Sequence, residues 1–210
     1  MRKTAKIKMG GNVAVFELGA AEIAEYIDAV VRAASKIIVM DINHSKLLLA
    51  KLMGPAECIK SKDFNALSQR VLVEMTGDGL EHTFEAAENV RLIHADLEVC
   101  HKGWGECTVT GFTGASLEIS NRLFQLMTGR VRRCMTFGDF KGRSELLGIA
   151  YEWMRRSFGI YAYPAHCMND NLITTAFDLP KAEASIRSAL QFQPDQTMTV
   201  NPLSGQLVAE

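Results

Sequence analysis

Short apolar runs alternate with amphipathic stretches along the first two thirds of the chain. The apolar runs predict strands at about 12–16, 36–41, 80–85 and 106–112, with a weak strand near 57–59. The amphipathic stretches predict helices at about 20–33, 44–53, 63–76 and 88–101. Strands that alternate with helices pair in parallel through right-handed crossovers. The pattern therefore predicts an α/β fold built on a mainly parallel sheet.

After Gly114 the alternation changes. A run at 131–137 carries arginine at alternate positions and is typical of an edge strand, so we expect the arginines at 130, 132 and 133 to lie on a solvated or interface edge. Residues 143–156 have helical spacing of apolar side chains, which predicts an amphipathic helix packed on the core. A strand is expected at 185–192, and the tail from Gln193 is expected to be frayed.

The segment from Val13 to Ala24 has the frame of a phosphate-binding loop with altered chemistry. In G-x-G-x-x-G the glycines allow a tight turn, close approach of a pyrophosphate and tight packing of helix on strand. Only the second glycine is present, as Gly19, whereas Glu17 and Glu22 occupy the other two positions. Asp41 ends the next apolar run, where an acidic residue holds a ribose in dinucleotide-binding folds.

Two glutamates in this loop argue against tight binding of a dinucleotide. Unit charges about 4 Å apart near a protein surface interact by roughly 4 kcal/mol. One carboxylate beside a pyrophosphate would therefore remove several decades of affinity. Glu22 also suits the first turn of a helix, where a negative charge complements the helix dipole.

The composition limits the classes of function. The 210 residues are 48% hydrophobic with a formal net charge of -1, so no whole-chain charge favours nucleic acid or an anionic membrane. No apolar run reaches the roughly 18 residues of a membrane span, and no signal-like segment follows the start, which predicts a cytoplasmic protein. The five cysteines form no C-x-x-C pair and no zinc-ligand spacing, so no metal site is expected.

Several runs in order carry a resemblance to a known family. They are Asp41-Ile42-Asn43, CHKGWGE from Cys100, FQLMTGR from Phe124, FGDFKGRS from Phe137, AFDL from Ala176 and SIR from Ser185. From about Thr4 to Phe192 the chain resembles the C-terminal half of a zinc-containing medium-chain alcohol dehydrogenase, in the branch of glutathione-dependent formaldehyde dehydrogenases.

The resemblance implies a Rossmann-type doubly wound parallel sheet at 1–140. Residues 141–192 would be a remnant of the catalytic domain and 193–210 a flexible tail. The family's zinc ligands lie in the half that this chain does not match, so the resemblance implies no metal. The vestigial cofactor positions are Gly19, Asp41, Lys46 and Arg187. Because Glu17, Ala20, Glu22 and Asp139 stand where the family has glycine, no bound cofactor is expected.

The resemblance also implies a homodimer through the edge strand Val131 to Phe137. Three functions from different classes remain open. The first is an isomerase, lyase or cyclase that acts without zinc or nicotinamide on an apolar small molecule, with Glu17, Glu22 and His166 as acid–base catalysts. The second is a non-catalytic dimer that binds a protein or a ligand. The third is a weak NAD-dependent oxidoreductase.

Overall fold

A computed structural model describes most of the chain and divides it into two compact units. The described residues are 4–60, 68–86, 90–111, 118–134, 136–155, 157, 165–182, 185–192, 198–200 and 207–209. The first unit comprises Met1–Ile149 and the second Ala150–Glu210. Their boundary lies within a helix, whereas the sequence placed the end of the cofactor domain near residue 140. Each unit is described below by itself.

The first unit contains a six-stranded parallel sheet. Its strands are β1 (Asn12–Phe16), β2 (Lys36–Asp41), β3 (Glu57–Lys60), β4 (His82–Glu85), β5 (Glu106–Val109) and β6 (Val131–Cys134). Their spatial order is β3-β2-β1-β4-β5-β6, and every pair is parallel. This is the doubly wound order, in which the direction of winding reverses between β1 and β4. The predicted Rossmann-type fold is confirmed.

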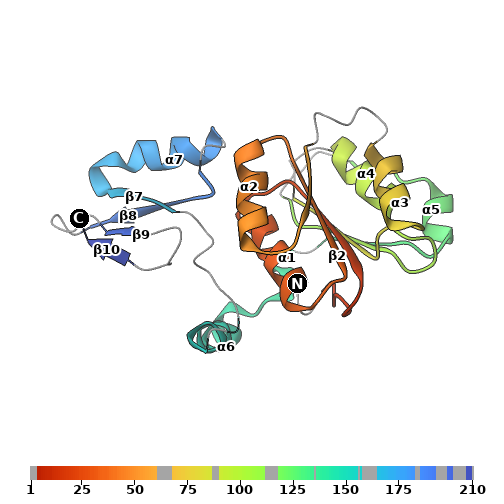
Figure 1. The fold of residues 1–210 in the computed structure, drawn as a ribbon, viewed down its shortest axis with the longest axis horizontal. Helices are drawn as coiled ribbons and strands as arrows, with labels where there is room; N and C mark the ends of the chain where they lie inside the picture. Colours follow the sequence, from red (N-terminus) through yellow and green to blue (C-terminus); the bar gives the residue numbers. More distant parts are fainter. Residues whose placement is uncertain are drawn as a thin grey trace. The chain divides into compact units, whose positions relative to one another are not determined.

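Helices cover both faces of this sheet. Helices α1 (Ala20–Val31) and α2 (His44–Met53) lie on one side, and α3 (Ser68–Thr76), α4 (Val90–Val99) and α5 (Leu123–Met127) lie on the other (Figure 1). Asn43 caps α2 by accepting a hydrogen bond from the Ser45 N–H at 2.9 Å. The arrangement follows from right-handed crossovers on either side of β1.

The core lies between the sheet and these helices. Val13, Ala14 and Val15 of β1 are fully buried, as are Ile38 and Val39 of β2. Strands that are buried on both faces read as continuous apolar runs, which explains why their sequences predicted them well.

Helix α6 (Gly142–Met154) confirms the predicted helix but corrects its predicted packing. We expected its apolar side chains to pack on the core, yet Leu146, Leu147 and Met154 are exposed, Leu147 at 79%. No residue of α6 with a described side chain is buried. The helical spacing was correct, but among the described residues of the first unit nothing buries Leu146 or Leu147.

The second unit is built on two small sheets. Strand β7 (Ala165–Asn169) pairs in parallel with β8 (Arg187–Gln191), and α7 (Ile173–Lys181) connects them. Two segments of the tail that we expected to be frayed, β9 (Met198–Val200) and β10 (Leu207–Ala209), pair as antiparallel strands. Across the described parts of both units, no helix is long and apolar enough to cross a membrane.

Candidate functional site

The loop between β1 and α1 keeps the shape of a glycine loop at Glu17. Glu17 has a φ of 73°, in the left-handed region that glycine adopts freely. A side chain in this region costs roughly 1–2 kcal/mol. The Glu17 N–H donates to the Met40 carbonyl at 2.6 Å, which ties the turn to β2, and the side chain of Glu17 is exposed.

Asp41, at the end of β2, holds this loop against the start of α2. Its side chain is 2% exposed. Oδ2 accepts a hydrogen bond from the Leu18 N–H at 2.8 Å, and Oδ1 accepts one from the Asn43 N–H at 2.6 Å. The Lys46 ammonium lies 3.8 Å from Oδ2. The predicted ribose position therefore also has a structural role in joining two loops.

Glu22 places its carboxylate at the N-terminus of α1. The side chain is 5% exposed, and the carboxylate lies beside the backbone N–H groups of Gly19 and of Glu22 itself, which lower its pKa. A Cβ atom on Gly19 would lie 2.6 Å from Glu22 Oε2, so the carboxylate fills the space that the glycine leaves. Burial raises the pKa of Glu22, while these N–H groups and Lys46 act in the opposite direction. The helix N-terminus, a natural anion site, thus holds an internal anion.

Two further glutamates lie buried behind this loop, and the sequence analysis did not identify them. Glu25 of α1 and Glu85 of β4 are both fully buried. The Thr110 hydroxyl donates to Glu25 Oε1 at 3.0 Å, while Oε2 has no hydrogen-bond partner within the described part of the chain. Burial, with smaller contributions from Glu22 and Glu85, raises the pKa of Glu25 well above its usual value. The available signal was position, because Glu25 lies four residues before the buried Ala29, on the same face of α1.

A second buried cluster corrects the interpretation of the arginines. The side chain of Arg132 is 8% exposed and lies 3.2 Å from Asp96 of α4, which is fully buried. The Cys107 thiol donates to both oxygens of Asp96, at 3.2 and 3.1 Å. Burial raises the pKa of Asp96 to about 6, against the Cys107 hydrogen bond and the charge of Arg132. Arg132 therefore faces inward, although we expected a solvated edge.

His166 and Arg187 belong to the second unit. His166 Nδ1 lies 2.8 Å from the Ser185 hydroxyl, which donates to the Arg187 carbonyl at 2.9 Å, and His166 is exposed. The catalytic roles expected for Glu17, Glu22 and His166, and the assignment of Arg187 as a vestigial cofactor position, stay predictions. The described residues contain no group of three or more His, Cys, Asp or Glu side chains that fits a metal ion, so they offer no donor set for zinc.

Comparison with known proteins gives consistent matches. A family model described as zinc-binding dehydrogenase matches residues 18–148. The S-(hydroxymethyl)glutathione dehydrogenase of Synechocystis sp. is 42% identical over 91% of this chain and 52% of that protein. The enzyme of the same name from Photobacterium damsela subsp. piscicida is 40% identical over the same shares. The chain therefore spans about half the length of these relatives.

Solved structures agree on the fold. An alcohol dehydrogenase zinc-binding domain protein from Burkholderia ambifaria matches 92% of this chain and 51% of its own, with a TM-score of 0.83 at 18% identity. A benzyl alcohol dehydrogenase from Acinetobacter calcoaceticus has the same TM-score at 17% identity, over 90% of this chain and 51% of its own.

These relatives correct the predicted reaction. The expected isomerase, lyase or cyclase is wrong, because the curated relatives at about 40% identity are named dehydrogenases. The non-catalytic dimer is not shown by these relatives. The homodimer and the apolar small-molecule ligand stay predictions. With a matched family model over more than half of its length and the corresponding sheet order, this chain belongs to the zinc-binding dehydrogenase family.

Proposed function

We propose that this chain is the dinucleotide-binding half of a dehydrogenase-related protein and that Glu22 controls access to its pyrophosphate position. The family and the names of the relatives support the oxidoreductase class. The observation that carries the proposal is the Glu22 carboxylate at the N-terminus of α1, whose Oε2 would lie 2.6 Å from a Cβ atom on Gly19. That position is where this fold binds the pyrophosphate of a dinucleotide.

The residues fit a nicotinamide dinucleotide at one end of the loop and not at the other. Asp41 and Lys46 supply a carboxylate and an ammonium 3.8 Å apart at the end of β2, the chemistry that a ribose and a nearby phosphate require. At Gly19 the Glu22 carboxylate takes both the space and the N–H donors. A dinucleotide therefore binds only after this carboxylate leaves.

Removal of the Glu22 side chain measures how strongly its carboxylate competes with the pyrophosphate of a dinucleotide. An ionised carboxylate about 4 Å from a phosphate costs roughly 4 kcal/mol, and a decade of affinity corresponds to about 1.4 kcal/mol. Because burial raises the pKa of Glu22, part of this repulsion is avoided when the group takes up a proton. We therefore expect Glu22→Gly to raise the affinity for NAD by about two decades or more.

Isothermal calorimetry with NAD tests the proposal on four variants. Glu22→Gln keeps the side chain and removes the charge, whereas Glu22→Gly removes both, and Glu17→Gly/Glu22→Gly restores both missing glycines. Asp41→Asn in the Glu22→Gly background is the control, because binding at this site must fall when the ribose carboxylate is lost. Micromolar binding by the wild type would contradict a closed loop. No gain in either Gly variant would refute control by Glu22.

We also propose that the edge strand β6 pairs with its copy in a second chain. In the described sheet β6 pairs only with β5, which leaves its other edge available. Leu123, Phe124 and Met127 of the adjacent α5 are more than two-thirds exposed, an apolar surface that favours association. Sedimentation velocity at tens of micromolar should give a dimer that Val131→Lys dissociates. Leu52→Lys, at an exposed position of α2, is the control, and a monomeric wild type would refute the dimer.

A further inference from the structure

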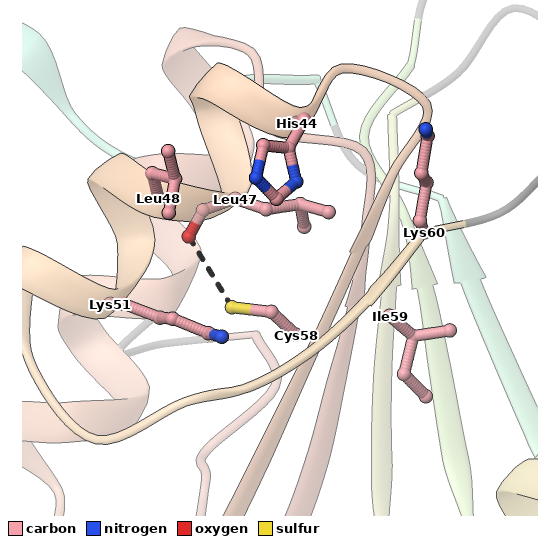
Figure 2. A pocket seen from close by; sticks show the side chains of 7 residues that line it. All are labelled: His44, Leu47, Leu48, Lys51, Cys58, Ile59 and Lys60. Carbon is pink, nitrogen blue, oxygen red and sulfur yellow. Dashed lines mark hydrogen bonds between the residues drawn. The ribbon is translucent and has the colours of Figure 1, made fainter.

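Helix α2 and strand β3 enclose a hollow that uses neither Glu22 nor Asp41. Its volume is about 320 Å³, and Figure 2 shows the seven side chains that line it: His44, Leu47, Leu48, Lys51, Cys58, Ile59 and Lys60. The four helix residues follow the spacing i, i+3, i+4 and i+7, which places them on one face of α2. A volume near 300 Å³ is at the lower end of the range for small-molecule pockets.

The lining separates into apolar and cationic parts. Leu47 is buried and Leu48 is half-exposed, and these two side chains form the aliphatic part of the lining. The side chain of Ile59 is buried against Met40 and Leu72, so its backbone borders the hollow. The polar groups are the His44 imidazole, the ammonium groups of Lys51 and Lys60, and the Cys58 thiol, with no carboxylate. The Cys58 thiol donates to the Leu47 carbonyl at 3.4 Å, which orients the sulfur along the pocket (Figure 2).

The cations of this pocket lack the partners that neighbouring lysines have. Lys36 lies 3.3 Å from Glu57, and Lys46 lies 3.8 Å from Asp41. Within the described part of the chain, neither Lys51 nor Lys60 forms an ion pair. The chain thus pairs the lysines on either side and leaves two ammonium groups beside an apolar surface. That combination favours a ligand with one anionic end and one apolar end.

Position along the helix adds to this preference. His44 begins α2, where the backbone N–H groups of the first turn favour an anion. Lys51 lies two turns further on, roughly 10 Å along the axis. Its ammonium lowers the pKa of the Cys58 thiol, although burial has the larger, opposite effect. Cationic groups therefore lie at both ends of the aliphatic surface.

We propose that this pocket binds a small organic anion with an aliphatic body, a carboxylate or a phosphate ester. The aliphatic body lies on Leu47 and Leu48 beside the strand β3, and the anionic group lies against Lys51, or against Lys60 and His44. The site is separate in its residues from the dinucleotide loop.

Alkylation of Cys58 tests this proposal directly. Cys134 and Cys167 are exposed, and Cys100 and Cys107 are buried, so Cys134→Ser/Cys167→Ser leaves Cys58 as the accessible thiol. The rate of its reaction with iodoacetamide is measured by mass spectrometry at increasing concentrations of octanoate, octyl phosphate or 1-octanol. We expect saturable protection by one or both anions. Octanol should need at least tenfold more for half-protection, and the ratio between the two anions identifies the preferred head group.

Substitution of the cations separates specific binding from a general effect on the thiol. Because Lys51 alters the reactivity of Cys58, the quantity compared is the concentration for half-protection and not the rate. Lys51→Gln or Lys60→Gln should raise that concentration about fivefold, as expected for a partly exposed ion pair. Lys102→Gln, an exposed lysine in a distant turn, should leave it unchanged. Isothermal calorimetry on protein that has not been alkylated should rank the wild type and these lysine variants in the same order of affinity for the anion.

Three results would overturn the proposal. They are no saturable protection by either anion, equal protection by octanol, and an unchanged half-protection concentration in Lys51→Gln/Lys60→Gln. Circular dichroism on each variant verifies that the fold is retained.

Discussion

His82 makes the stability of this protein sensitive to acid. It begins β4, in the middle of the sheet, and is 7% exposed. Its Nδ1 atom has no hydrogen-bond partner within the described residues. Burial lowers the pKa of His82 from 6.5 to about 4, and the charge of Lys8 acts in the same direction. Replacement by phenylalanine keeps a ring in the core and removes the titration.

The sign and the size of the effect follow from this pKa. The unfolded chain takes up a proton below about pH 6.5, whereas the folded chain does so only near pH 4. The stability that neutral His82 provides is therefore complete above pH 6.5 and is lost as the pH falls through the folded pKa. With 1.36 kcal/mol for each pKa unit, the loss approaches about 3 kcal/mol.

Urea unfolding at pH 7.5, 6.0 and 4.5 measures this loss in the wild type and in His82→Phe. The difference between the two proteins removes the contribution of other titrating groups. We expect His82→Phe to gain on the wild type by about 1.4 kcal/mol for each pH unit between pH 6 and 4.5. Lys8→Gln should weaken the dependence, because it removes the second cause of the shift. A folded His82 that titrates near pH 6.5 by NMR, or parallel pH curves for the two proteins, would refute this account.

Three further changes have defined outcomes in urea unfolding. Glu25→Gln should be more stable than the wild type above neutral pH and equally stable in acid. The pKa of Glu25 is raised, so the folded protein loses stability when this carboxyl ionises as the pH rises, and glutamine cannot ionise. Parallel curves of stability against pH for the two proteins would contradict this. Glu17→Gly should gain up to about 1 kcal/mol by relieving a φ of 73°, and an equal gain in Glu17→Ala would exclude backbone strain as the cause. Tyr26→Phe should lose about 1 kcal/mol with its hydrogen bond to the Ala50 carbonyl, and no loss would mean that water replaces the bond.

Strands β1 and β2 could be predicted because each is buried on both faces. Residues 13–15 and 37–40 are continuous apolar runs, and the observed strands β1 and β2 agree with the predicted bounds. The bounds of α2 were also correct, since Asn43 and Gly54 flank the helix. These features depend on neighbours in the sequence, so the sequence alone carries them.

Features that depend on distant partners could not be predicted in this way. Arg132 looked like a solvated side chain until the fold placed Asp96 beside it, 36 positions earlier in the chain. Asp96 itself carried a signal, because it lies on the helix face of the buried Ile93 and Cys100. A charged residue on such a face requires a partner. Leu147 was expected to be buried and is exposed, because helical spacing cannot tell whether any element covers the apolar face.

Glu22 connects the stability of the loop with its capacity to bind a ligand. Its carboxylate lies beside N–H groups at the N-terminus of α1, an interaction typically worth about 0.3–1 kcal/mol, but burial has the larger, opposite effect and raises the pKa of Glu22. A dinucleotide would take over the same donors, so it must first displace a group that the fold already uses. Gly19 remains necessary in either state, since its missing Cβ leaves room for the carboxylate at 2.6 Å just as it would for a phosphate. Glu22→Gln should therefore strengthen the affinity for a dinucleotide and, because burial raises the pKa of Glu22, should not weaken the unliganded fold at neutral pH.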